Sequence, residues 1–147
     1  MAEKGSIRSR PLGATATVGR TGYPAIRSRT GGTLQIATGA SEPGFNPIDL
    51  LYASLSACMA MSARIAANRL GVMANIRSIA VEVAGDKHEP EPSRVEKLSL
   101  TLHVEGDVDE EMKARILLIA EEICTVSNTL KTPPRIEAAL AAPGDTD

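Results

Sequence analysis

The stretch LLYASLSACMAMSARIAANRLG, Leu50 to Gly71, predicts one long helix that is apolar on nearly every side. Between Leu50 and Ala63 it contains no charged residue, and polarity comes mainly from three serines. A helix without a polar face is buried on all sides, so we expect it at the centre of the fold. The uncharged run has 14 residues, fewer than the ~20 that a membrane span needs. No membrane span is therefore predicted.

The residues that flank this stretch carry the signals that start and stop a helix. Asn46 is a good N-cap, Pro47 suits the first helical position, and the negative charge of Asp49 suits the first turn. Gly71 is a natural stop after the last apolar residue. We therefore expect a helix over residues 47–70, which would be ~36 Å long at about 1.5 Å per residue.

Alternation of apolar and polar residues predicts four strands, of which VEKLSLTLHVE is the clearest. The predicted strands cover residues 14–18, 33–37, 78–85 and 95–105. Turns rich in glycine and proline separate them, as in hairpins. Short strands joined in this way around a long helix indicate an α+β fold with antiparallel sheet.

The C-terminal third is expected to add two helices and a strand. Residues 107–123 begin with acids and continue with apolar residues at helical spacing, which predicts an amphipathic helix. A short helix that Ser127 or Asn128 caps is expected before Pro133. Residues 135–140 are expected to close the sheet as a final strand.

Length, composition and charge limit the class of protein. The 147 residues suit a single domain, residues 1–147, with residues 1–12 as a loose arm. Only three residues are aromatic, so the core is lean and burial against a second subunit is attractive. The net charge is −2 and the N-terminal arginines are scattered without aromatic residues, which argues against a nucleic-acid partner. No apolar segment of the signal-peptide type follows the basic N-terminus, so we expect a cytoplasmic protein with reduced thiols.

The two cysteines are the best candidates for chemistry because the motifs of other enzymes are missing. Cys58, Cys124, His88 and His103 fall in separate elements without metal-ligand spacing, so no metal site is predicted. There is no GxSxG, GxGxxG or GxxxxGK[ST] motif, so neither a serine hydrolase nor a nucleotide cofactor is indicated. A cysteine in an apolar helix is most often packing material. By contrast, the polar run after Cys124 could offer backbone N–H groups to a thiolate.

Three motifs in combination resemble the OsmC/Ohr family, the osmotically induced and organic hydroperoxide resistance proteins. They are ATATVGRTG (Ala14–Gly22), GFNPIDLLYASLSACMAM (Gly44–Met61) and ICTVSNTL (Ile123–Leu130). The likeness extends over residues 12–140. It implies an intertwined homodimer with the long helices at its centre and antiparallel sheet contributed by both chains. This arrangement suits a helix that is apolar on every side.

The resemblance also implies roles for individual residues. Cys58 matches the peroxidatic thiol, Cys124 the resolving thiol, and Arg20 the arginine beside the peroxidatic sulfur. Hydroperoxide-reducing members have an acid directly after the Asn-Pro pair. Here that position is Ile48, so Asp49 is the candidate for the acid. The family uses no bound cofactor or metal, and an external dithiol, often a lipoyl group, reduces the disulfide.

The function implied is a thiol peroxidase that reduces organic hydroperoxides, with inorganic ones as further candidates, in oxidative-stress defence. A guanidinium near the sulfur would favour the thiolate and stabilise the alkoxide that leaves when the O–O bond breaks. The alternative is a non-enzymatic dimer that binds a small apolar ligand, with structural cysteines. Ile48 in place of the acid and the Ala/Met lining of the long helix favour this alternative. The two hypotheses differ in whether Cys58 reacts faster than an ordinary buried thiol.

Overall fold

A computed structural model describes residues 9–144, and residues 1–8 of the predicted arm and residues 145–147 lie outside the described part. The chain divides into two compact units, one ending at Leu51 and the other beginning at Tyr52. The boundary falls within helix α1 (Pro47–Arg69). The single domain expected from the sequence stays a prediction.

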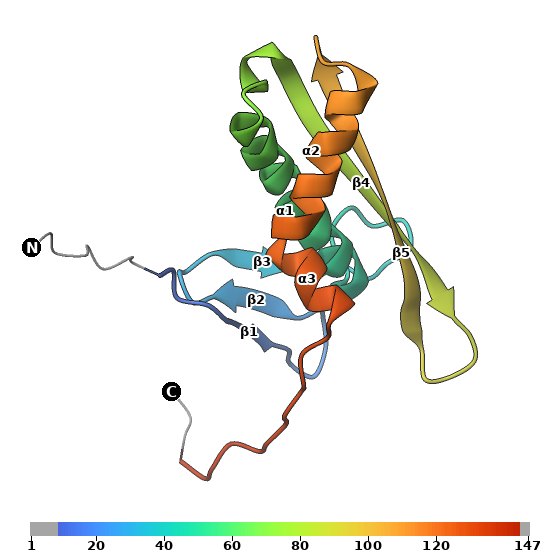
Figure 1. The fold of residues 1–147 in the computed structure, drawn as a ribbon. Helices are drawn as coiled ribbons and strands as arrows, with labels where there is room; N and C mark the ends of the chain where they lie inside the picture. Colours follow the sequence, from blue (N-terminus) through green and yellow to red (C-terminus); the bar gives the residue numbers. More distant parts are fainter. Residues whose placement is uncertain (1–8, 145–147) are drawn as a thin grey trace, which may run out of the picture. The chain divides into compact units, whose positions relative to one another are not determined.

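The N-terminal unit contains a three-stranded antiparallel sheet in the order β1-β2-β3, drawn in blue in Figure 1. Its strands are β1 (Ala14–Thr17), β2 (Ala25–Ser28) and β3 (Thr33–Gln35). The outer strands were predicted and the middle one was not, because the sequence AIRS is too short to show alternation. In the sheet, Ile26 lies in register between Ala16 and Leu34. Only this cross-strand pairing reveals β2 as a strand.

Helix α1 begins with a reciprocal pair of hydrogen bonds, the arrangement called a capping box. Asn46 Oδ1 accepts from the Asp49 N–H at 2.7 Å, and Asp49 Oδ2 accepts from the Asn46 N–H at 3.0 Å. The predicted N-cap and the predicted start at Pro47 are therefore confirmed. The helix ends at Arg69, and Gly71 has a φ of 74°, which glycine adopts without steric cost.

The C-terminal unit packs helices against one face of a long β-hairpin, as Figure 1 shows. Its elements after α1 are η1 (Met73–Asn75), β4 (Ile76–His88), β5 (Arg94–Gly106), α2 (Glu110–Ile123) and α3 (Thr125–Lys131). Alternate apolar side chains of the hairpin pack against a core that includes Met59 of α1 and Ile116 of α2, both fully buried. A two-stranded hairpin is marginal alone, so this helical cover supports it.

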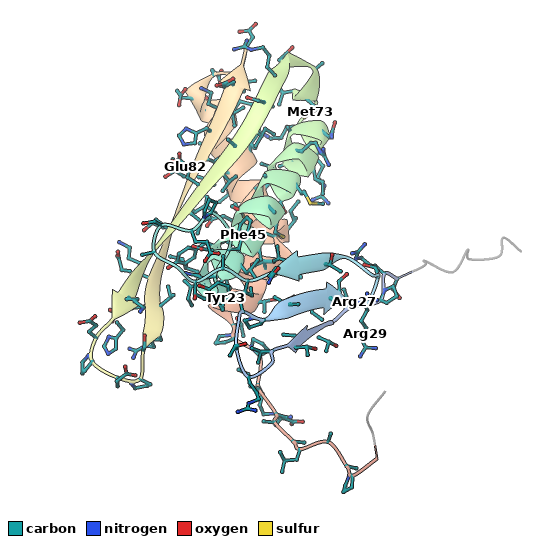
Figure 2. The ribbon with its side chains drawn as sticks, turned by 180° about the vertical axis from the view of Figure 1, so that it is seen from behind. Tyr23, Arg27, Arg29, Phe45, Met73 and Glu82 are labelled. Carbon is teal, nitrogen blue, oxygen red and sulfur yellow. The ribbon has the colours of Figure 1, made fainter. Side chains whose placement is uncertain are left out.

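The opposite face of the hairpin is polar and carries cross-strand pairs. His103 Nε2 lies 3.3 Å from Glu82 Oε2, and Ser78 Oγ donates to Glu105 Oε2 at 2.9 Å. Figure 2 shows Glu82 on the side of the hairpin turned away from α1. Both long strands predicted from alternation are confirmed, and each extends beyond its predicted bounds.

Helix α1 is buried on one face and exposed on the other within the single chain. The buried face includes Leu55, Met59 and Ala63, whereas Met61 is 58% exposed and Ile65 is 44% exposed. The expected all-round burial is therefore not reached within one chain. By length and composition alone α1 could also cross a membrane, a test that core helices of globular proteins pass as well. The predicted absence of membrane contact stays a prediction.

The segment 135–140 does not form the predicted closing strand. Residues 133–140 have no regular secondary structure, and Ile136 and Leu140 are 90% and 100% exposed. A strand needs a neighbour for its backbone hydrogen bonds, and no described strand of this chain pairs with the segment. The α+β class with antiparallel sheets is nevertheless confirmed by the two sheets and three α-helices of the described residues.

Candidate active site

Cys58 lies in the middle of α1 and is half-buried against the core of the C-terminal unit. It follows the buried Leu55 by three residues and directly precedes the fully buried Met59. Because these neighbours sit on the packed face, the helix turns the Cys58 side chain toward the edge of that face. The thiol is free.

Cys124 connects α2 to α3 and is fully buried. Its sulfur caps α3 by accepting a hydrogen bond from the Ser127 N–H at 3.4 Å. The prediction that Ser127 or Asn128 caps this helix is therefore wrong. The first helical N–H groups need an acceptor, and the sulfur of Cys124 supplies it one turn earlier than expected.

The fold brings the two thiols together although the residues are far apart in sequence. The Cys124 thiol donates a hydrogen bond to the Cys58 sulfur. The backbone N–H groups of Thr125 and Val126, at the start of α3, are directed at the same sulfur, as is the hydroxyl of Ser62. A cluster of hydrogen-bond donors for a thiolate therefore surrounds Cys58 within one chain, drawn from α1 and the α2–α3 junction.

The hydrogen-bond donors around Cys58 lower the pKa of its thiol. Burial has the largest influence on this thiol and alone would raise the pKa, because a buried thiolate loses its hydration. The hydrogen bonds from Val126 N–H, the Cys124 thiol, Ser62 and Thr125 N–H together outweigh it. Each of these donors favours the charged sulfur. Cys58 therefore ionises more readily than an ordinary cysteine.

Burial and the contact with Cys58 raise the pKa of Cys124. Burial is again the largest influence, and the hydrogen bond that its thiol donates to Cys58 and the charge of that thiolate add to it. The N–H groups of Ser127 and Val126 offset only part of this. Within the pair, ionisation therefore favours Cys58 and the proton favours Cys124, which is the order of acidity that a nucleophile and its resolving partner need.

Arg20 and Asp49, the other two predicted site residues, lie in the N-terminal unit. Arg20 is exposed in the turn that follows β1. Asp49 lies in the first turn of α1, where one carboxylate oxygen is used by the capping box. No ion pair joins Arg20 to Asp49 in the described part of the chain. The approach of either residue to Cys58 stays a prediction.

Sequence reasoning missed the residues that donate to the Cys58 sulfur. It assigned the N–H groups after Cys124 to Cys124 itself, whereas those of Thr125 and Val126 serve Cys58. It treated Ser62 only as a polar residue of the helix. The spacing from Cys58 to Ser62 is four residues, which places the two side chains on one face of a helix. This spacing was the feature of the sequence from which a contact between Ser62 and Cys58 could have been predicted.

No group of three or more His, Cys, Asp or Glu side chains within residues 9–144 could hold a metal ion. The two histidines instead contact glutamates of the hairpin, His88 with Glu96 at 3.4 Å and His103 with Glu82 at 3.3 Å. The groups directed at the Cys58 sulfur act as hydrogen-bond donors, which favours the thiolate form of this cysteine.

The fold and the pair of interacting thiols define an α+β protein built around a cysteine-bearing central helix, and sequence comparison identifies its family. A family model described as OsmC-like protein matches residues 39–139, which includes both cysteines. The chain belongs to the OsmC-like family. An uncharacterized protein of Haloferax volcanii is 27% identical over 132 residues, covering 89% of this chain and 95% of that protein.

Solved structures show the same fold. An OsmC-like protein from Mycoplasma pneumoniae matches with a TM-score of 0.73 and 17% identity, covering 86% of this chain and 91% of that one. An organic hydroperoxide resistance protein from Elizabethkingia anophelis matches with a TM-score of 0.69 and 21% identity, covering 86% and 92%. At these identities the similarity establishes the architecture, and the α+β fold inferred from the sequence is confirmed.

Proposed function

We propose that this protein is a thiol peroxidase that reduces organic hydroperoxides with Cys58 as the attacking thiol. The observation that supports the proposal most directly is the contact between Cys58 and Cys124, in which Cys58 has a lowered pKa and Cys124 a raised one. The family includes proteins named for organic hydroperoxide resistance, among them the one from Elizabethkingia anophelis. A thiolate in contact with a second thiol is what such a reaction requires.

The first step oxidises Cys58. The thiolate attacks the terminal oxygen of the hydroperoxide, an S–O bond forms, and the O–O bond breaks. The organic oxygen leaves as an alkoxide and takes a proton to become an alcohol, while Cys58 becomes a sulfenic acid. The donors around the sulfur hold the thiolate in place before the attack.

The second step closes a disulfide. The Cys124 sulfur attacks the Cys58 sulfenic acid, its thiol proton leaves with the hydroxyl as water, and an S–S bond forms. An external dithiol then attacks the disulfide, returns both cysteines to thiols and becomes a disulfide itself. A lipoyl-type dithiol is the reductant that the family resemblance suggests. A reducing compartment such as the cytoplasm would supply it.

Arg20 is proposed to stabilise the departing alkoxide. A fixed guanidinium offers paired N–H donors to a developing negative charge, and in a site closed to water such donors strongly favour the transition state. Asp49 is proposed to orient Arg20 with Oδ1, because Oδ2 accepts from the Asn46 N–H. A carboxylate in this position would also stabilise the start of α1.

A homodimer is proposed as the working form. Met61 and Ile65 are exposed on the outer face of α1, and a second copy of the same helix would bury them. The exposed apolar residues Ile136 and Leu140 lie in the segment for which a strand was predicted. A second chain would offer this segment the pairing edge that the single chain lacks.

Stoichiometric cumene hydroperoxide added to the reduced protein tests the proposed reaction. We expect rapid loss of two hydrogen atoms by intact mass and a Cys58–Cys124 bridge by peptide mapping. Cys58→Ser should abolish the reaction with peroxide. Cys124→Ser should consume one equivalent and stop at the Cys58 sulfenic acid, which a sulfenic-acid-specific reagent would trap. Arg20→Ala should slow the first step by about 10²-fold or more, the usual effect of removing one transition-state donor.

Two results would contradict the proposal. One is a set of thiols that stays reduced, and the other is oxidation of Cys58 no faster than that of a control thiol in the unfolded chain. Either outcome would favour the alternative of a dimer that binds a small apolar ligand. Arg27→Ala is a matched control for Arg20→Ala, because Arg27 lies in β2 of the same N-terminal unit and has no proposed role.

A further inference from the structure

We propose that Ser62 is a positioning residue for the Cys58 thiolate, holding the sulfur in its reactive charge state by a hydrogen bond from the Ser62 hydroxyl. The inference rests on the proposed function, since it concerns how the attacking thiol is prepared. It assigns part of the activation of Cys58 to a residue of the same helix, four positions further along the chain.

The position of Ser62 on α1 brings its hydroxyl to the sulfur. Residues four apart on a helix are neighbours on one face, and each side chain leans toward the helix N-terminus. Ser62 therefore leans toward Cys58, and its hydroxyl contacts the sulfur. Ser62 is only 5% exposed, so water has little access to replace this contact.

Two other hydroxyl groups on the helices, those of Ser56 and Thr129, donate to backbone carbonyls. Ser56 Oγ donates to the Ala53 carbonyl at 3.0 Å, and Thr129 Oγ1 donates to the Thr125 carbonyl at 2.7 Å. This backbone bond is the usual one for serine and threonine inside a helix. The polar contact of the Ser62 hydroxyl is instead with the Cys58 sulfur, four residues earlier in the same helix.

The buried face of α1 continues beyond Ser62 with apolar residues. Ala63, Ala66 and Ala67 of the same buried face are fully buried, and alanine is the residue that a helix tolerates best. A buried hydroxyl is unfavourable there unless it makes a hydrogen bond. With a thiolate as acceptor, the hydrogen bond becomes charge-assisted and stronger than a neutral one. The hydroxyl therefore stabilises the ionised form of Cys58 more than the thiol form.

The decisive measurement is the rate of Cys58 alkylation by iodoacetamide as a function of pH, read by peptide mapping of the whole protein. Ser62→Ala should reduce this rate roughly three- to tenfold at neutral pH, because the thiolate loses one donor and becomes a smaller fraction of the thiol. At alkaline pH, where Cys58 is ionised in both proteins, the rates should converge, and the more basic thiolate of the variant should react somewhat faster. A loss of packing alone would not move the pH profile in this way.

Two further variants complete the test. Ser62→Thr keeps the hydroxyl and should restore most of the reaction at neutral pH. Ser56→Ala removes the same group from the same helix but from a contact with a carbonyl, and its profile should match that of the unaltered protein. A Ser62→Ala profile that superimposes on the unaltered one would overturn the assignment, as would a Ser56→Ala profile displaced equally.

The outcome is separable from that of the proposed function. Alkylation needs no peroxide, so a displaced profile in Ser62→Ala would establish the role of Ser62 even in a protein that does not react with hydroperoxide. In a protein that does react, we expect Ser62→Ala to slow bridge formation with cumene hydroperoxide at neutral pH in about the same proportion as alkylation.

Discussion

At the residue scale, the start of helix α3 lies beside the sulfurs of Cys58 and Cys124, yet the pKa of Cys58 is lowered and that of Cys124 is raised. The N–H of Thr125 is directed at Cys58 and that of Ser127 at Cys124, whereas the N–H of Val126 acts on both sulfurs. Burial raises the pKa of both thiols, but only Cys58 also accepts hydrogen bonds from side chains. The Val126 N–H favours the Cys58 thiolate most, and the Cys124 thiol, the Ser62 hydroxyl and the Thr125 N–H add to its effect. The asymmetry therefore comes from where α3 begins relative to α1.

The asymmetry predicts the order in which the thiols react. The lowered pKa of Cys58 keeps it ionised until the pH falls through that value, whereas the raised pKa of Cys124 keeps it protonated to higher pH. On titration from acid to alkaline pH, Cys58 should therefore become reactive first. Competitive labelling with iodoacetamide and peptide mapping would measure both profiles in one sample. Coincident profiles, or Cys124 labelled first, would contradict this assignment.

The sequence predicted part of this site and could not predict the rest. Cys58 and Cys124 stand out as the only two thiols, and their pairing was expected from the family resemblance. Their separation of 66 residues carries no information about contact, because tertiary packing sets it. The cap of α3 was missed because cysteine is not among the preferred N-cap residues. Ser62 was missed because the sequence does not distinguish a serine that donates to a sulfur from any other serine in a helix.

At the element scale, helices and strands with a regular local pattern were predicted well. Elements that are short, or that form only when a neighbouring strand pairs with them, were not. The capping box of Asn46 and Asp49 and the long alternation of β5 are local properties of the sequence. Strand β2 has four residues, and its pairing partners alone define it. The segment 135–140 has the alternation of a strand but lacks a neighbour in the chain. Strand formation requires both.

Removing the cap of α1 should reduce stability without a large structural change. Asn46→Ala should lower the free energy of unfolding by about 1 kcal/mol, because the Asp49 N–H loses its acceptor. Urea denaturation followed by circular dichroism would measure the difference. Ser41→Ala, in the exposed loop before the helix, should change stability by less than about 0.5 kcal/mol. An equal effect of both variants would argue against the cap.

The end of β5 contains a glycine that no other residue can replace cheaply. Gly106 has a φ of 145°, and an added Cβ would meet the Asn75 carbonyl oxygen and the Ile76 Cα. These are backbone atoms that cannot move aside, so Gly106→Ala should cost about 2–4 kcal/mol of unfolding free energy.

Gly71→Ala is the matched control for this prediction. Gly71 also has a positive φ, 74°, but nothing lies within 4 Å of an added Cβ. Its substitution should cost about 1–2 kcal/mol, from backbone conformation alone. Equal losses for Gly106→Ala and Gly71→Ala would show that the contact with residues 75 and 76 contributes nothing.

At the scale of the whole molecule, several features are incomplete in one chain and point to a second. The outer face of α1 exposes Met61 and Ile65, the hairpin of β4 and β5 has only two strands, and Ile136 is 90% exposed. Each is a surface or an edge that a partner would complete. The lean core expected from three aromatic residues leads to the same conclusion. A symmetric dimer is the simplest assembly that satisfies all of these features.

A charge on the outer face of α1 should therefore dissociate the proposed dimer. In the proposed dimer, Met61→Glu would place an unpaired carboxylate between two copies of the helix, which should weaken association by about 100-fold or more. Sedimentation equilibrium over a range of concentrations should give a dimer for the unaltered protein and a monomer for the variant. Ser99→Glu adds the same charge to the polar outer face of the hairpin, where Ser99 is exposed, and should leave the dimer intact. A monomeric unaltered protein, or a Met61→Glu variant that stays dimeric, would mean that this face of α1 is not an interface.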